Sequence, residues 1–246
     1  IGFDDAGLDE TEHQQQMEAH LRTVNARIQC SLADIATSFP DTIRHAESPV
    51  LRTAPTPMRL LSGLVRRSGI KVVLTGEGAD EVLGGYDIFK EAKVRQFWAR
   101  NPASAWRPAL LKRLYPYLDL TSAQSAAYLR EFFGVGLDQP QDPFFSHLPR
   151  WMTTGQCKLF LSEDLRRQIE GSAIERFRAE LPADIGRWHP FNRSEYVEAR
   201  TLLPSYLLSS QGDRMLMANS VEGRFPFLDH RLIAFANELH PRYKMR

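Results

Sequence analysis

Apolar residues recur at spacings of three and four between residues 17 and 39, which is typical of one face of an amphipathic helix. The residues that form this face are Met17, Leu21, Val24, Ile28, Leu32, Ile35 and Phe39. The pattern predicts a single long helix. We expect Pro40 to end it, because proline cannot donate the backbone hydrogen bond that a helix requires.

A second helix and a strand are predicted directly after this region. Thr56 is suited to cap the helix with Pro57 at its first position, and Gly69 is suited to end it. The apolar run at residues 70–74 then predicts a short buried strand. A helix followed by a strand indicates part of an α/β layer.

The remainder of the chain is predicted to be mostly helical from about residue 90 onward. Residues 158–180 and 194–209 show helical character, and Asp229 is suited to cap a last helix. Residues 136–150 contain three prolines, two aspartates and one glycine and predict a surface loop. The expected fold class is therefore α/β with a large, mostly helical remainder.

Composition and charge exclude several classes of protein. The 246 residues are 43% hydrophobic and 25% charged, which is ordinary for a soluble globular protein. A net charge of +1 does not favour a nucleic-acid or anionic-membrane surface, and no apolar run approaches the roughly 20 residues of a membrane span. Cys30 and Cys157 form no C-x-x-C pair, so we expect neither a disulfide framework nor a zinc site, and a reducing cytoplasm fits best.

The turn after the predicted strand carries the strongest chemical signal. It reads Thr75-Gly76-Glu77-Gly78, and two further acids, Asp80 and Glu81, follow where a helix can begin. Ligands of open α/β sheets bind beyond the carboxyl ends of the strands. The turn would therefore present a hydroxyl, free backbone N–H groups and three carboxylates to a ligand, which suits a magnesium nucleotide.

Two long motifs resemble the synthetase domain of the glutamine-hydrolysing asparagine synthetases. Residues 75–86, T-G-E-G-A-D-E-V-L-G-G-Y, are similar to that family's S-G-E-G-A-D-E-x-F-G-G-Y. Residues 202–232 are similar to its second signature, D-R-x-x-M-A-x-S-x-E-x-R-x-P-F-L-D, and residues 1–11 resemble a further family segment. The resemblance is weakest across residues 95–190.

The resemblance implies a fold and a domain organisation. The fold would be part of a parallel sheet of the adenine-nucleotide α-hydrolase-like type, also called a PP-loop ATP pyrophosphatase. Residues 1–90 would form the α/β nucleotide-binding part of the synthetase domain, and residues 91–246 its mainly helical part. The family's S-G-G-x-D-S nucleotide loop, its pyrophosphate-binding lysine and its N-terminal glutaminase domain do not occur in the sequence, so we expect an internal piece of a larger synthetase.

The resemblance also implies a reaction. Aspartate would be amidated to asparagine at the expense of ATP, with Mg²⁺, through a β-aspartyl-AMP intermediate. Ammonia would come from glutamine, hydrolysed by a glutaminase domain of the same polypeptide, and the enzyme would be a cytoplasmic homodimer. Two alternatives stay open: an amidotransferase of the same fold acting on a peptide, cell-wall or polysaccharide carboxylate, and a non-catalytic nucleotide-binding scaffold.

Residue roles in the first motif follow from the same resemblance. Glu77 would be catalytic, acting in acyl-adenylate formation and on the incoming ammonia, although a glutamate between two glycines is more often a solvated turn residue. Thr75 and Gly76 would contact ATP, although Thr75 also suits a strand end. Asp80 would hold Mg²⁺. Glu81 either supports the site or only complements the dipole of a first helical turn.

Two residues of the second signature complete the candidate set. Asp213 and Arg214 lie in a polar segment bracketed by apolar residues. Buried polar groups need partners, so we expect this segment mainly to brace the wall of the active site, with one or two members touching substrate. An isolated Asp-Arg pair is more often structural than catalytic.

Overall fold

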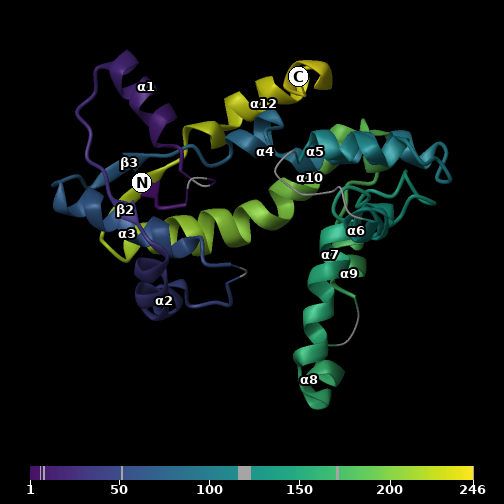
Figure 1. The fold of residues 1–246 in the computed structure, drawn as a ribbon, viewed down its shortest axis with the longest axis horizontal. Helices are drawn as coiled ribbons and strands as arrows, with labels where there is room; N and C mark the ends of the chain where they lie inside the picture. The colour runs from purple at the N-terminus through teal and green to yellow at the C-terminus, as the bar shows by residue number, and fades with distance from the viewer. Residues whose placement is uncertain (6, 8, 51, 116–122, 170–171, 246) are drawn as a thin grey trace. The chain divides into compact units, whose positions relative to one another are not determined.

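The structure, a computed structural model, describes all residues except 6, 8, 51, 116–122, 170–171 and 246 (Figure 1). The chain forms two compact units. The first unit comprises Ile1–Ala79 and Arg200–Ile233, and the second comprises Asp80–Ala199 and Ala234–Arg246. The expected fold class, α/β with mostly helices, is confirmed at this level.

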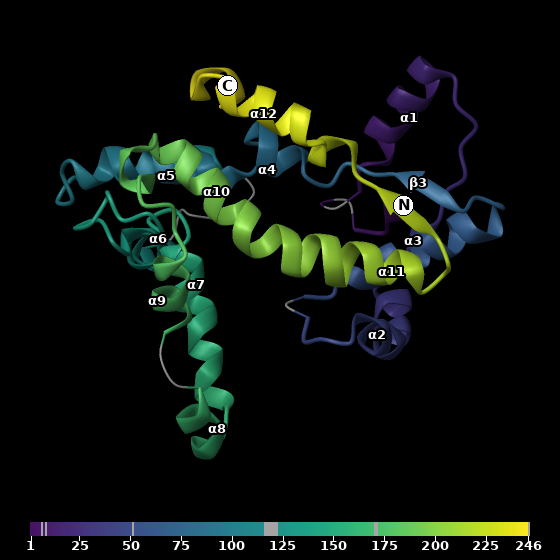
Figure 2. The same cartoon turned by 180° about the vertical axis from the view of Figure 1, so that it is seen from behind.

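The first unit contains all four strands of the described residues, in two parallel pairs. In one pair β1 (Gly2–Phe3) lies beside β2 (Gln29–Cys30). In the other, β3 (Val72–Leu74) lies beside β4 (Glu222–Arg224), and Figure 1 shows these two strands adjacent to each other. The helices of the unit are α1 (Thr11–Leu21), α2 (Leu32–Ala46), α3 (Pro55–Arg67), the π-helix Leu203–Asp213, α11 (Arg214–Met217) and the 3-10 turn Pro226–Leu228. Helix α11 packs against α3 (Figure 2).

The prediction of one long helix across residues 17–39 is wrong. Helix α1 ends at Leu21, where Arg22 adopts a left-handed φ of 54°. A new helix, α2, begins after Ser31, whose hydroxyl accepts a hydrogen bond from the backbone N–H of Asp34, while the Asp34 carboxylate accepts one from the Ser31 N–H. This capping box starts α2 independently, and Pro40 lies inside it instead of ending it.

Helix α3 begins earlier than predicted and ends as predicted. Its first residue is Pro55, and Thr56 lies within the helix, with its N–H donating to the carbonyl of Thr53 (2.9 Å). Thr56 is therefore not the cap. Gly69, with a φ of 78°, follows the helix end, as expected for a residue in the left-handed region.

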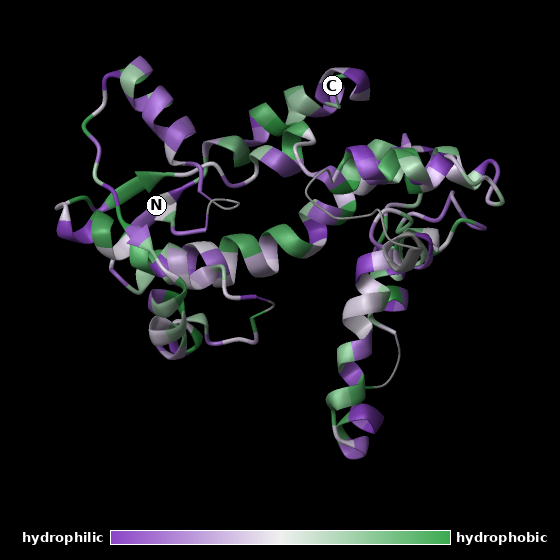
Figure 3. Ribbon diagram, in the orientation of Figure 1, coloured by the Kyte–Doolittle hydropathy of each residue, from purple (hydrophilic) through white to green (hydrophobic). Residues whose placement is uncertain are grey.

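Strand β3 is not buried, in contrast to its prediction. Val72 is 39% exposed and Leu74 is 73% exposed, and Figure 3 shows the hydrophobic colour along this strand. In the described residues β3 has one strand neighbour, β4. A pair of strands covers little of its own faces, so apolar character alone does not bury the strand.

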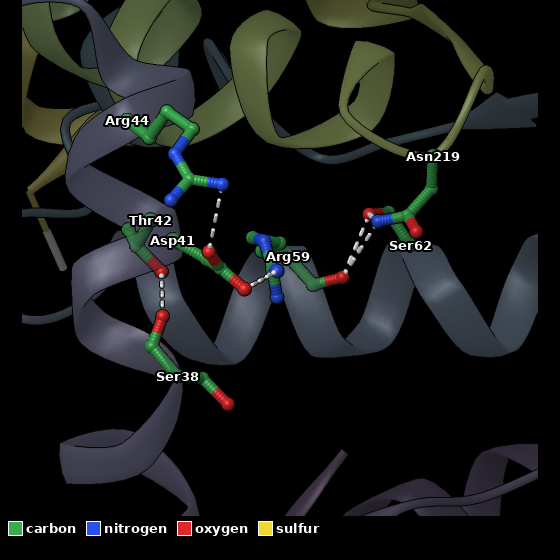
Figure 4. A network of polar contacts seen from close by, with 7 residues as sticks. All are labelled: Ser38, Asp41, Thr42, Arg44, Arg59, Ser62 and Asn219. Atoms are coloured by element: carbon green, nitrogen blue, oxygen red, sulfur yellow. Dashed lines mark hydrogen bonds and ion pairs between the residues drawn. The ribbon is translucent and has the colours of Figure 1, made fainter.

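A polar network joins α2, α3 and the segment after α11 (Figure 4). The hydroxyl of Ser62, which is 1% exposed, donates to the carbonyl of Met215 (2.7 Å) and accepts from the side-chain amide of Asn219 (2.8 Å). The Asn219 amide also donates to the carbonyl of Arg59 (3.0 Å), and the Arg59 guanidinium pairs with Asp41 (2.9 Å). The network fixes the residues that lead into β4.

We expect Ser62→Ala to lower the free energy of unfolding of the full-length protein by about 1–3 kcal/mol, because it leaves the Met215 carbonyl unpaired in the interior. Urea denaturation measures the effect. Ser68→Ala, at an exposed position after the same helix, is the matched control and should stay within about 0.5 kcal/mol of the parent protein. Equal stability of the two variants would contradict a structural role for the network.

The helices and 3-10 turns of the second unit are its only regular secondary structure among the described residues, and turns and irregular segments join them. Its α-helices are α4 (Ala79–Leu83), α5 (Asp87–Ala99), α6 (Ala123–Gly134), α7 (Leu148–Gly155), α8 (Glu163–Gln168), α9 (Ala173–Ala179), α10 (Pro190–Leu202), α12 (His230–Glu238) and α13 (Pro241–Lys244), of which α4, α10 and α12 extend across the unit boundary. Its 3-10 turns are Arg107–Arg113, Gln156–Phe160 and Ile185–Arg187. The main hydrophobic cluster comprises Trp98, Leu111, Tyr115, Leu129, Phe133, Leu137 and Phe145.

The prediction that residues 136–150 lie on the surface is wrong, because part of this segment is buried. Leu137 and Phe145 belong to the hydrophobic cluster. The guanidinium of Arg95, which is 0% exposed, donates to the carbonyls of Phe133 (2.9 Å), Val135 (2.5 Å) and Phe145 (2.5 Å). These bonds replace the hydrogen bonds that an irregular segment would otherwise need from water, so the segment can be buried.

Predictions for the other helices agree with the structure in most places. Residues 194–209 are helical, within α10 and the π-helix, and Asp229 caps α12 by accepting from the N–H of Arg231 (2.8 Å). The helical stretch predicted at 158–180 contains two short helices, α8 and α9, and residues 170–171 lie outside the described part of the chain.

Candidate functional site

The turn after β3 is held against the end of β4. The N–H of Thr75 donates to the carbonyl of Arg224 (3.0 Å), which continues the parallel pairing of the two strands by one more hydrogen bond. The turn then closes on itself, with the N–H of Ala79 donating to the carbonyl of Gly76 (3.1 Å). The first motif is thus bound by its backbone to the second.

Gly78 provides a second link between the two motifs. It has a φ of 91°, a conformation that side chains other than hydrogen disfavour. A methyl group on Gly78 would also collide with the side chain of Leu228, from the F-P-F-L-D segment. Only glycine meets both conditions. The sequence shows the two motifs in order along the chain, but nothing in either motif indicates that they pack together.

Two polar atoms of the turn are buried without a partner among the described residues. They are the hydroxyl oxygen of Thr75 and the Oε2 atom of Glu77. A buried polar atom without a partner costs about 1–3 kcal/mol, and native proteins keep few of them. A hydroxyl and a carboxylate oxygen in this state suit a ligand that offers both acceptors and N–H or O–H donors.

Gly76, between these two residues, is exposed, and no heavy atom lies within 4 Å of the position a methyl group would take. The backbone of the turn is therefore accessible at this residue. An accessible backbone next to two unpaired side-chain oxygens fits the predicted contact with a nucleotide at Thr75 and Gly76. These three residues, 75–77, all belong to the first unit.

Asp80 opens the second unit, in the first turn of α4. Its backbone carbonyl accepts hydrogen bonds from the N–H groups of Gly84 (2.9 Å) and Gly85 (3.0 Å). Asp80 as a whole residue is exposed, yet partial burial of its carboxyl group raises its pKa above the ordinary value. The carboxylate lies against Gly85, where a side chain would collide with the Asp80 Oδ1 atom. Gly85 therefore provides the space that the Asp80 side chain occupies.

We expect Gly85→Ala to lower the free energy of unfolding by about 1 kcal/mol, because the new methyl group must displace the Asp80 carboxylate, which is the movable end of an exposed side chain. Gly186→Ala is the matched control in the same unit, since Gly186 has no neighbouring atom within 4 Å of the added methyl group. Urea denaturation of both variants tests the difference. If Gly85→Ala were as stable as the control, the close approach of Asp80 would not be a constraint.

Glu81 is not a solvated residue of the first helical turn. It is 3% exposed, and its carboxylate accepts a hydrogen bond from the hydroxyl of Tyr86 (2.9 Å). Burial raises the pKa of Glu81 and, together with the Glu81 carboxylate, that of Tyr86. The geometry gives Glu81 a supporting contact within the motif.

Arg214 supports the start of α11. Its guanidinium pairs with the carboxylate of Glu47 (2.7 Å) and donates to the hydroxyl of Ser209 (3.3 Å). Nearby, the hydroxyls of Ser48 and Ser210 are 3.0 Å apart. Asp213, the last residue of the π-helix, is exposed. These contacts are those of a bracing segment, and none of them brings Asp213 or Arg214 to the turn at residues 75–78.

The donor set for a metal ion is small. Within the described ranges, no three His, Cys, Asp or Glu side chains converge on one point. Mg²⁺ bound to phosphates often takes only one or two protein carboxylates and completes its shell with phosphate oxygens and water. Asp80 is suited to such a role. None of the helices in the described part of the chain has the length and apolar character of a membrane span.

Comparison with known proteins gives one family and several relatives. Residues 1–246 match the family described as Asparagine synthase. The chain is 28% identical to amidase chyE of Penicillium rubens over 100% of its length, and 28% identical to amidase chry2 of Gibberella zeae over 86%. It is 23% identical to asparagine synthetase [glutamine-hydrolyzing] 1 of Bacillus subtilis, also over 100%.

The chain spans 37%, 32% and 37% of these three relatives, so each of them is much longer. No solved structure matches the chain.

Proposed function

Because this chain belongs to the asparagine synthase family, we propose that the protein of which it is part amidates a carboxylate substrate at the expense of ATP. The observation that carries this proposal is the pair of unpartnered buried oxygens on Thr75 and Glu77, in the turn that the second motif holds in place. A ligand with hydrogen-bond donors and acceptors would satisfy both atoms. A nucleotide and an amine nucleophile together offer those groups.

The proposed substrate is aspartate, and the proposed product is asparagine. The side-chain carboxylate of aspartate attacks the α-phosphorus of ATP, and pyrophosphate leaves, which gives β-aspartyl-AMP. Ammonia then attacks the acyl carbon, a proton is lost from nitrogen, and AMP leaves. Thr75 and Gly76 contact ATP in this proposal, the former through its free hydroxyl and the latter through its accessible backbone.

Asp80 is proposed to hold Mg²⁺, which when bound neutralises charge on the pyrophosphate. Gly85 leaves space for the Asp80 carboxylate where it lies in the structure. Glu81 is proposed to support the motif through Tyr86, and Arg214 to brace the second signature through Glu47, with Asp213 beside it. Glu81 and Arg214 already make the contacts that these supporting roles require.

Glu77 is proposed to act on the amine. Its Oε2 atom can accept a hydrogen bond from ammonia and take the proton released when the carbon–nitrogen bond forms, as a general base does. A carboxylate oxygen whose acceptor sites were already filled by protein donors would lack this capacity. The unpaired state of Oε2 is therefore what supports this role.

Several wider features belong to the same proposal. We propose that ammonia is supplied from glutamine by a glutaminase domain of the same polypeptide, which is in keeping with the words glutamine-hydrolyzing in the name of the Bacillus subtilis relative and with its greater length. A homodimeric assembly and a cytoplasmic location are proposed from the family resemblance alone. We also propose that β3 and β4 belong to a larger parallel sheet of the PP-loop type. In that arrangement residues 1–90 form the α/β nucleotide-binding part, and residues 91–246 form the mainly helical part.

A second candidate function is amidation of a different carboxylate. Two of the relatives with 28% identity, chyE and chry2, are named amidases, not asparagine synthetases. The chemistry at Thr75, Glu77 and Asp80 would be unchanged, and only the acceptor would differ. A non-catalytic scaffold is less well supported, since a scaffold has no use for an unpaired buried carboxylate oxygen at Glu77.

The test is pyrophosphate release from Mg-ATP by the full-length protein supplied with ammonia, measured with and without aspartate. Aspartate-dependent release with an equal amount of asparagine would support the proposed reaction. Release only with another carboxylate would favour the second candidate. Absence of nucleotide cleavage with every acceptor tested would overturn both and favour the scaffold.

A further inference from the structure

Lys244, in the C-terminal helix α13, is a buried cation in the second unit. Its side chain is 3% exposed. The ammonium group donates to both carboxylate oxygens of Glu195 on α10 (2.8 and 2.9 Å) and to the backbone carbonyl of Val82 on α4 (3.3 Å). One side chain thus joins three helices that are far apart in the sequence.

A contribution of the Lys244–Glu195 ion pair to protein stability does not by itself explain why Lys244 is buried here. Burial raises the pKa of Glu195 to about 7, although the Lys244 ammonium group acts in the opposite direction. Buried ion pairs are often no more stabilising than apolar residues of the same size, because both charges lose their hydration. What such a pair does provide is one defined position for the groups that it joins.

Helix α4 needs an external contact to be held in place. It has five residues, Ala79–Leu83, and a helix this short does not persist without tertiary contacts. The Val82 carbonyl lies in its last turn, where carbonyls have no partner within the helix, and a lysine can supply the missing donor.

The end of α4 is also enclosed by side chains. A methyl group on Gly84, which has a φ of 75°, would collide with the ring of Phe191 and would meet the Cβ atom of Lys244 at 3.6 Å. The Lys244 ammonium group lies 5.0 Å from the centroid of the same ring. The hydrogen bond to Val82 and these contacts therefore act on the same short segment, residues 82–84.

We propose that Lys244 is a positioning residue, which holds the helix that carries Asp80 by anchoring its carboxyl end to α10 and α13. The part of this inference that concerns Mg²⁺ rests on the proposed function. The part that concerns α4 itself does not, because the contacts of Lys244 with Val82, Gly84 and Glu195 are independent of any ligand.

The experiment compares two variants of the full-length protein. Glu195→Gln keeps an oxygen that can accept from Lys244 and retains the donor to Val82. The buried lysine then lacks a carboxylate partner and is expected in its neutral form, which still donates to both groups. Glu195→Gln combined with Lys244→Met removes both charges together, so no carboxylate is left buried and unpaired, while the apolar stem over Gly84 is kept. Lys158→Met, at an exposed position of the same unit, is the control for loss of a lysine.

The first readout is hydrogen exchange in a peptide that covers residues 79–86, without any ligand. We expect exchange in the double variant to be about tenfold faster than in Glu195→Gln, with residues 87–99 unchanged, because α4 alone has lost its anchor. Thermal unfolding of both proteins checks that they are folded. If the double variant does not fold, Glu195→Gln with Lys244→Gln replaces it, since glutamine is too short to reach the Val82 carbonyl.

The second readout is the Mg²⁺ concentration at half-maximal pyrophosphate release. We expect about a fivefold rise in the double variant, with a rate at saturating Mg²⁺ within about twofold of the parent protein. Equal exchange over residues 79–86 in both variants would overturn the inference, whatever the activity. Faster exchange with unchanged Mg²⁺ dependence would overturn its connection to Asp80. Absence of pyrophosphate release by the parent protein would count against the proposed function alone.

Discussion

Glu77→Gln is expected to lower the rate of amide formation by the full-length protein by about 10²–10⁴-fold. Glutamine has nearly the same shape as glutamate, so the turn and its hydrogen bonds to β4 stay in place. It cannot take a proton, and the group in place of Oε2 either donates instead of accepting or accepts only weakly. Pyrophosphate release measures acyl-adenylate formation, and the amide product measures the later step with ammonia. Both are followed in the same reaction.

The control for Glu77→Gln is Glu10→Gln, which makes the same chemical change at an exposed residue of the same unit. Its rates should remain within about twofold of the parent protein. A Glu77→Gln protein that turns over at near-normal rate would remove Glu77 from the mechanism. Loss of amide formation with pyrophosphate release preserved would restrict Glu77 to the step with ammonia and exclude a role in forming the acyl-adenylate.

Arg95→Met is expected to destabilise the second unit strongly. The change removes the donors to the carbonyls of Phe133, Val135 and Phe145 and leaves these groups without partners in the interior. The loss should reach about 3–5 kcal/mol. Burial lowers the pKa of Arg95 to about 10, and the nearby Glu91 carboxylate acts in the opposite direction.

Urea denaturation compares Arg95→Met with Arg100→Met, an exposed position at the end of the same helix, which should change stability by less than about 0.5 kcal/mol. Arg95→Lys should be intermediate, since an ammonium group cannot serve three carbonyls arranged around a planar guanidinium. A loss below about 1 kcal/mol for Arg95→Met would mean that the segment at 133–145 is held by its apolar residues alone.

Features with a local cause could be predicted from the sequence. Gly69 ends α3 and Asp229 caps α12 as predicted, because each of these signals acts within a few residues of itself. The long helix at 17–39 was predicted wrongly for a related reason. The apolar spacing continues across Ser31, although Ser31 and Asp34 carry the local signal for a new helix.

Features with a distant cause could not be predicted in this way. The burial of Leu137 and Phe145 depends on Arg95, about 40–50 residues earlier in the chain, and nothing in the segment itself indicates this partner. The exposure of β3 depends on how many strands adjoin it, which its own apolar residues do not reveal.

The candidate site shows the same division. Its residues could be selected, because Thr75, Gly76 and Glu77 form a recognisable turn after a strand. Three features of the site are tertiary contacts that no pattern in the sequence predicts. They are the parallel pairing of β3 with β4, the contact of Gly78 with Leu228, and the burial of Glu81 beside Tyr86. The anchoring of α4 by Lys244 was missed for the same reason.

The pairing of β3 with β4 has a consequence for the order of folding. The two strands are separated by roughly 150 residues, so closing this loop in an unfolded chain costs about 4 kcal/mol of entropy before any strand contact forms. Most of the intervening residues belong to the second unit. If that unit folds first, the effective loop becomes shorter and the pairing faster, so the turn at Thr75–Gly78 should be among the last parts of the chain to acquire its native structure.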